Sequence, residues 1–119
     1  MLIPFLKAKI HNAAVTKSEL DYEGSISIDE NIINQAGLQE FEKVLVVNKN
    51  NGARFETYII KAPAGSKEFG INGAAARLAM VGDKIIIFSF ALFSPEELKN
   101  HKPKILIYSQ ETDSFIEKK

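Results

Sequence analysis

The stretch KIIIFSFAL, residues 84–92, is the strongest β-forming run in the chain. It combines β-branched and aromatic residues, which favour strands, and it is too short for a typical buried helix. Its apolar content is that of a strand in the interior of a sheet. We therefore predict an interior strand over residues 84–92 and assign the rest of the chain outward from it.

Shorter runs with strand character lie along the rest of the chain. Alternating or β-branched patterns predict strands over residues 2–15, 25–28, 44–47, 54–60 and 104–108. The dipeptide Asn51-Gly52 is a strong hairpin signal between two of them. Residues 17–21 have a turn-like composition, and the polar tail after Ser109 is expected to fray.

Helix-capping signals predict three short helices. They begin after Asp29, at Asn72 and after Ser94, and Gly37 is expected to end the first. The order of elements has no βαβ rhythm and no linker. The pattern therefore indicates one mainly β domain over residues 1–119, best fitted by a closed or nearly closed β-barrel with short helices.

The composition excludes several classes of function. Lysine and arginine number 15, as do aspartate and glutamate, so no net field favours nucleic acid or an anionic membrane. The chain has no cysteine, which excludes disulfides, thiolate nucleophiles and cysteine-ligated metals. His11 and His101 are far apart, so we expect no metal site. Without a signal-peptide pattern or the roughly 18 apolar residues of a membrane helix, we expect a cytoplasmic protein with no membrane partner.

The dipeptide Gly24-Ser25 offers the most specific chemistry, because a serine hydroxyl can attack the carbonyl of the preceding residue. Glycine at that position tolerates a strained backbone and leaves the carbonyl unshielded. The attack turns the amide into an ester, elimination then cuts the chain, and hydrolysis leaves a pyruvoyl group at position 25. Such a group can form a Schiff base and act as an electron sink. By itself, however, Gly-Ser is most often a turn.

Five segments together resemble the aspartate 1-decarboxylase family. They are KIHNAAVT (9–16), YEGSISID (22–29), NGARFETY (51–58), NGAAAR (72–77) and VGDKIIIFSF (81–90). They follow the order and spacing of the family, with Gly-Ser at its processing position, and the resemblance extends to about Pro103. It implies a double-psi β-barrel that assembles as a homotetramer with active sites between subunits, and a maturation factor is a further candidate partner.

The resemblance also implies a reaction. The precursor cuts itself between Gly24 and Ser25 into a β chain, residues 1–24, and an α chain, residues 25–119, that begins with the pyruvoyl cofactor. The mature enzyme converts L-aspartate to β-alanine and carbon dioxide. The β-alanine feeds the synthesis of pantothenate and coenzyme A.

The candidate site residues follow from the same resemblance. Ser25 is the pyruvoyl precursor and Tyr58 the proton donor, and Gly24, Thr57 and Asn72 assist processing. The substrate contacts are assigned to Lys9, Arg54, Thr57, Gly73, Ala74 and Ala75. His11 and Tyr22 are lesser candidates for the pocket or the processing site. The two basic residues suit the carboxylates of aspartate, and the small residues at 73–75 let a ligand approach the backbone.

Two alternatives stay open from the sequence. One is a non-catalytic barrel that binds a small ligand or partner and keeps Gly-Ser as a turn. The other is the same chemistry on a related amino acid such as glutamate, because one methylene changes the fit of a pocket by only about 1–3 kcal/mol. Val47 also stands where some family members have a tryptophan against the substrate, so that contact is not carried over.

Overall fold

The computed structural model describes residues 1–119 as nine strands and three short helices. The strands are β1 (Ile3–Ala14), β2 (Lys17–Glu19), β3 (Ser25–Asp29), β4 (Lys43–Asn48), β5 (Arg54–Ala62), β6 (Phe69–Asn72), β7 (Lys84–Phe93), β8 (Lys104–Ser109) and β9 (Ser114–Lys118). The helices are α1 (Glu30–Ala36), the 3-10 helix η1 (Gly73–Leu78) and α2 (Pro95–Leu98). The prediction of a mainly β fold with short helices is confirmed.

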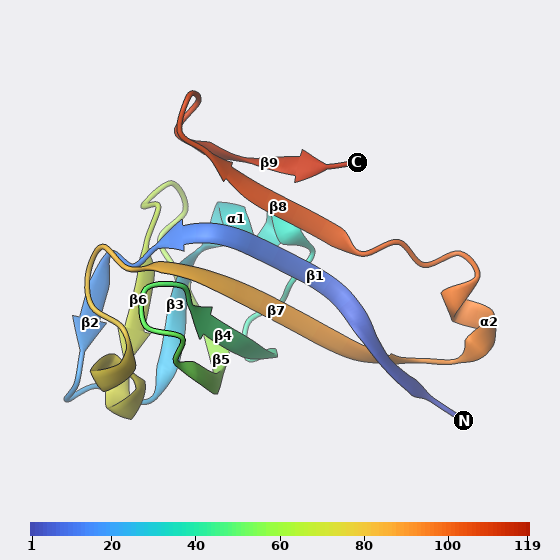
Figure 1. Cartoon of the computed structure of the whole chain (residues 1–119), viewed down its shortest axis with the longest axis horizontal. Helices are drawn as coiled ribbons and strands as arrows, with labels where there is room; N and C mark the ends of the chain where they lie inside the picture. Colours follow the sequence, from blue (N-terminus) through green and yellow to red (C-terminus); the bar gives the residue numbers. More distant parts are fainter.

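The strands form one mixed sheet in the order β2-β6-β3-β5-β4-β7-β1-β8-β9. β1 and β7 run side by side along the long axis of the molecule (Figure 1), antiparallel to each other. The sheet curls, because β2 follows β1 after two residues and yet pairs with β6 at the far end of the order. Thr16, between them, donates its backbone N–H to the Phe69 carbonyl at 2.9 Å. This curled sheet is compatible with the double-psi barrel, which stays a prediction.

The interior position of β7 is confirmed for its first half. This strand lies between β4 and β1, and Ile85, Ile87 and Ser89 on one of its faces are each 1% exposed or less. The second half differs, since Phe90 is 53% and Leu92 61% exposed. There β7 has passed the end of β4, and only β1 lies beside it.

Three segments have more strand structure than the sequence indicated. Residues 69–72 were not predicted to form a strand, but Phe69–Asn72 form β6 between β2 and β3. Residues 17–21 were expected to turn, but Lys17–Glu19 form β2, which pairs in parallel with β6. The tail was expected to fray, but Ser114–Lys118 form β9 against β8. The ring of Phe115 packs against Phe69, with the centroids 5.7 Å apart, and this tertiary contact holds a segment of polar composition. None of the helices has the length and apolar character needed to cross a membrane.

Asp29 ends β3 and begins α1, as the capping signal predicted. Its carboxylate accepts hydrogen bonds from the backbone N–H groups of Asn31 at 2.8 Å, Gly65 at 3.0 Å and Lys67 at 2.8 Å. Burial by itself raises the pKa of the Asp29 carboxyl, but the three hydrogen bonds outweigh it and leave the pKa below its ordinary value. The residue therefore fastens the loop after β5 to the end of β3.

Asp29→Asn should lower the free energy of unfolding by about 2 kcal/mol at pH 7, because asparagine has one acceptor oxygen and no charge. Folding lowers the pKa of Asp29, so this stabilisation is present above the unfolded-state value of about 4. It is lost as the pH falls through the lower, folded-state value. Urea unfolding of the wild type and the variant between pH 7 and pH 3 measures the difference between their free energies of unfolding. This difference should narrow only below about pH 4. A difference that stays constant over that range would exclude the charge as its source.

Candidate active site

The Gly24–Ser25 bond lies where an exposed loop enters the buried strand β3. Gly24 is exposed, whereas Ser25 is only 2% exposed. The Ser25 hydroxyl donates a hydrogen bond back to the Glu23 carbonyl at 3.1 Å and accepts one from Asn72 Nδ2 at 3.0 Å. The hydroxyl is thus turned toward the residues that precede it and held from two sides.

Asn72 supplies the hydrogen bond that holds Ser25 from the neighbouring strand. It ends β6 directly opposite Ser25 in the antiparallel ladder and is 3% exposed. Its Nδ2 also donates to the Ser27 hydroxyl at 2.9 Å, so both amide hydrogens have acceptors. The prediction that Asn72 caps the following helix is wrong for its side chain, which makes no capping bond. The side chain is committed to the two serines instead.

Gly73 packs closely against the backbone of the Gly24–Ser25 segment. Its φ is +81°, and a Cβ built there would lie 2.7 Å from Gly24 Cα and 3.1 Å from the Tyr22 carbonyl oxygen. The expectation of a strained backbone at Gly24 is not met, because Gly24 has no positive φ and a Cβ there would meet nothing within 4 Å. The steric constraint therefore lies at Gly73, which lets η1 begin against the backbone of Gly24.

Strand β5 carries three candidate residues, Arg54, Thr57 and Tyr58, and Tyr58 directly precedes its first pairing with β3. β3 and β5 are parallel, with Ile26 opposite Ile59 as the first registered pair. Ser25 is the residue before this pair on β3, and Tyr58 is the residue before it on β5. Tyr58 is 37% exposed and Thr57 is half-buried, as expected for neighbours on opposite faces of a strand.

A polar cavity of about 360 Å³ adjoins Asn72. Tyr22, Ser27 and Asn72 are among the residues that line it. Its remaining walls carry four charged residues, Lys17, Glu19, Lys61 and Glu68. Tyr22, a lesser candidate from the sequence, thus shares this cavity with Asn72, and the cavity gives water and small polar molecules room next to the amide that holds Ser25.

Three further candidates make no hydrogen bond to Ser25 within one chain. Lys9 lies on β1, where its Nζ sits 5.5 Å from the centre of the Phe88 ring. Arg54 begins β5, exposed and opposite Val47. The Nδ1 atom of His11, also on β1, is buried without a hydrogen-bond partner. None of the three has a hydrogen bond or an ion pair to Ser25.

The environment of His11 keeps its imidazole neutral near pH 7. Burial lowers the pKa of His11 most, and the nearby charges of Lys9 and Lys49 lower it further.

The two alanines after Gly73, both candidates for substrate contacts, differ in their burial. Ala74 is exposed, whereas Ala75 packs against the core.

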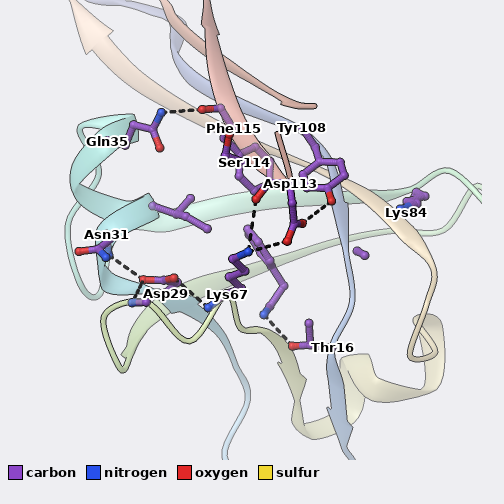
Figure 2. A pocket seen from close by; sticks show the side chains of 14 residues that line it. Thr16, Asp29, Asn31, Gln35, Lys67, Lys84, Tyr108, Asp113, Ser114 and Phe115 are labelled. Atoms are coloured by element: carbon purple, nitrogen blue, oxygen red, sulfur yellow. Dashed lines mark hydrogen bonds and ion pairs between the residues drawn. The ribbon is translucent and has the colours of Figure 1, made fainter. Parts of the chain in front are cut away.

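A second cavity, of about 350 Å³, lies at the opposite end of β3 and contains none of the predicted site residues. It is formed by α1, the loop after β5 and the β8–β9 hairpin, and Figure 2 shows Lys67, Tyr108 and Asp113 pointing toward one another there. Asp113 accepts from Lys67 Nζ at 2.6 Å and from the Tyr108 hydroxyl at 2.5 Å. These contacts fasten the hairpin over the cavity, away from the Gly24–Ser25 bond.

Comparison with known proteins accounts for this arrangement. The family model described as aspartate decarboxylase matches residues 1–114. The chain belongs to the aspartate decarboxylase family. A protein of Coprothermobacter proteolyticus named aspartate 1-decarboxylase is 62% identical over 97 residues, which cover 82% of this chain and 81% of that protein.

Two further relatives carry the same name. The protein of Chlorobium chlorochromatii is 57% identical over 107 residues, covering 90% of this chain and 83% of its own length. The protein of Halalkalibacterium halodurans is 51% identical over 117 residues, covering 98% of this chain and 91% of its own length. The match to the aspartate decarboxylase family therefore spans nearly the whole chain, including every candidate residue.

Sequence reasoning missed Ser27 and the Glu23 carbonyl. Ser27 shares the amide of Asn72 with Ser25, and Glu23 accepts the Ser25 hydroxyl. The spacing Ser25-x-Ser27 was a usable signal, because residues two apart on a strand point to the same face. A backbone carbonyl leaves no signal in a sequence.

Proposed function

We propose that this chain decarboxylates L-aspartate to β-alanine and carbon dioxide for pantothenate synthesis, after it has cut itself between Gly24 and Ser25. The observation that carries the proposal is the Ser25 hydroxyl, buried at the end of an exposed loop and held between Asn72 and the Glu23 carbonyl. A turn serine needs no such clamp, so the observation favours an enzyme over a non-catalytic barrel. Membership of the aspartate decarboxylase family supports the choice of substrate.

The self-cleavage uses groups that surround the bond. Ser25 Oγ attacks the Gly24 carbonyl carbon, a C–O bond replaces the C–N bond, and the hydroxyl proton ends on the freed amino group. Thr57 polarises the Gly24 carbonyl in this step, and Asn72 orients the attacking oxygen. Loss of the Ser25 Cα proton then expels the Gly24 carboxylate and leaves dehydroalanine. Addition of water and release of ammonia give the pyruvoyl group at position 25.

The surroundings of position 25 fit a pyruvoyl group. The loop before it is exposed, so a chain end there breaks no part of the core. The Asn72 amide is within hydrogen-bond distance of the present hydroxyl, and it would hold the carbonyl oxygen that replaces it. When formed, the group supplies an electron sink for the bond to the leaving carboxylate.

The chain's own side chains then do the remaining work in this proposal. Lys9 and Arg54 bind the two carboxylates of aspartate, and Tyr58 returns a proton to the carbon that loses carbon dioxide. Lys9 and Arg54 make no hydrogen bond to Ser25 within one chain. The proposal includes a homotetramer in which they act across an interface between copies. The absence of a partner for the buried His11 Nδ1 keeps that residue a candidate for processing.

A denaturing intact-mass spectrum of the purified protein after mild warming tests the proposal. We expect two fragments split after Gly24, with the larger one lighter than its serine form by the mass of one ammonia. Incubation with L-aspartate should then yield β-alanine, with no rise on adding pyridoxal phosphate. A single unbroken mass that persists after addition of an extract of the source cells, as a supply of the candidate maturation factor, would contradict self-cleavage. A strong rise with pyridoxal phosphate would contradict the cofactor.

A further inference from the structure

Phe41 has a backbone conformation that its side chain disfavours. Its φ is +71°, in the left-handed region where glycine and asparagine are usual and a bulky residue is an outlier. The ring is also 71% exposed, so burial in this chain contributes little to offset the strain. Residues with a strained backbone cluster at functional sites, so the exposed and strained Phe41 is a candidate for a functional side chain.

The backbone of Phe41 is fastened to the strand that carries Tyr58. The Phe41 N–H donates to the Ile59 carbonyl at 2.7 Å, and the Ile59 N–H donates to the Glu42 carbonyl at 3.1 Å. These two bonds tie the loop before β4 to β5 at the residue that follows Tyr58. The position of Phe41 is therefore set relative to Tyr58 and not by the loop alone.

The side chain of Glu42 fastens the same loop to β1 and β7. Its carboxylate accepts from Lys7 Nζ at 3.0 Å on each oxygen and from the Gln39 N–H at 3.1 Å. The hydroxyl of Ser89, which is 1% exposed, also donates to it. Four hydrogen bonds to the half-buried Glu42 carboxylate fix the loop at this point. They thereby help to hold Phe41, the preceding residue, in the left-handed region.

The Phe41 ring meets the Tyr58 ring. Their centroids are 6.3 Å apart and the planes are inclined by 38°, within the range of favourable aromatic pairs. Tyr58 is 37% exposed, and its hydroxyl makes no hydrogen bond within the chain. Phe41 is the one aromatic ring paired with Tyr58 within the chain, and this contact restrains the direction of the phenol.

We propose that Phe41 is a positioning residue that holds the Tyr58 ring in the direction needed to deliver a proton, and that the strain at Phe41 is retained for this contact. The proposal rests on the proposed function, in which Tyr58 is the acid. It assigns Phe41 no part in self-cleavage, because the ring contacts Tyr58 and not the Gly24–Ser25 bond. Turnover should therefore depend on the ring at position 41, whereas maturation should not.

Phe41→Asn tests the proposal, because asparagine suits the left-handed conformation and removes the ring. We expect complete cleavage, a melting temperature no lower than that of the wild type, and kcat lower by about tenfold with KM within about twofold. Phe41→Tyr, which keeps a ring, should retain kcat within about twofold. Lys67→Asn is the matched control, since Lys67 also has a positive φ, 59°, but lies at the far cavity. It should leave kcat unchanged.

A double-mutant cycle with Tyr58→Phe separates this proposal from the function beneath it. Tyr58→Phe should cleave normally and lose about 100-fold or more in kcat, and Phe41→Asn should then cause no further loss. An undiminished kcat in Phe41→Asn, or an additional tenfold loss in the Tyr58→Phe background, would overturn the role of Phe41 while leaving Tyr58 as the acid. Normal turnover in Tyr58→Phe would instead remove the acid role itself, and the proposal with it.

Discussion

Ser25→Ala should abolish both cleavage of the chain and formation of β-alanine. Alanine has no oxygen to attack the Gly24 carbonyl, so neither the ester nor the pyruvoyl group can form. The fold should survive, because the substitution removes one small group and leaves Asn72 bonded to Ser27, at a cost of about 1 kcal/mol. The intact mass after warming and the β-alanine yield from L-aspartate measure the two losses on one sample.

Ser27→Ala is the matched control for this experiment. Ser27 lies two residues further along β3, is 7% exposed and accepts from the same Asn72 nitrogen at 2.9 Å. Its loss costs a comparable hydrogen bond but removes no nucleophile, so we expect two fragments and measurable turnover. Cleavage in Ser25→Ala would rule out Ser25 as the nucleophile. A block in both variants would mean that the Asn72 network, and not the Ser25 hydroxyl, limits the reaction.

Local patterns predicted six of the nine strands and most helix ends, because these depend on neighbouring residues. The alternation in Ser25–Ile28, the turn at Gly52 and the capping box at Ser94 are all present. Elements that depend on distant contacts were missed. β9 is stabilised by pairing with β8 and by the contact between Phe115 and Phe69, and a polar tail does not indicate either.

The site residues also divide into those that the local sequence predicted and those that depend on distant contacts. Gly24 and Ser25 were predictable from the dipeptide and the family resemblance. The side-chain role of Asn72 was not predictable from its position before a helix, because the register of β6 against β3, which turns its amide to Ser25, is a tertiary property. Phe41 had no signal at all, since nothing in its neighbours encodes a left-handed φ at a phenylalanine. Lys9 and Arg54 depend on an assembly beyond one chain in the proposed tetramer.

Gly73→Ala should slow self-cleavage by about 100-fold while the protein still folds. The new Cβ would lie 2.7 Å from Gly24 Cα, which is a backbone atom and not the end of a flexible side chain. The exposed loop carrying Gly24 is the softer side of this contact, so Gly24 should move and take its carbonyl out of line with Ser25 Oγ. The clash and the positive φ together should lower the free energy of unfolding by about 2–4 kcal/mol.

Gly52→Ala separates these two effects, because it has the strain without the clash. Gly52 has a φ of +76°, close to the +81° of Gly73, and a Cβ there would meet nothing within 4 Å. It should lose about 1 kcal/mol of stability and cleave at the wild-type rate. A time course of precursor and fragments on a denaturing gel, alongside urea unfolding, gives both quantities. Equal cleavage rates in the two variants would show that contact between Gly73 and Gly24 does not align the bond, and the orientation of Ser25 by Asn72 would then have to suffice.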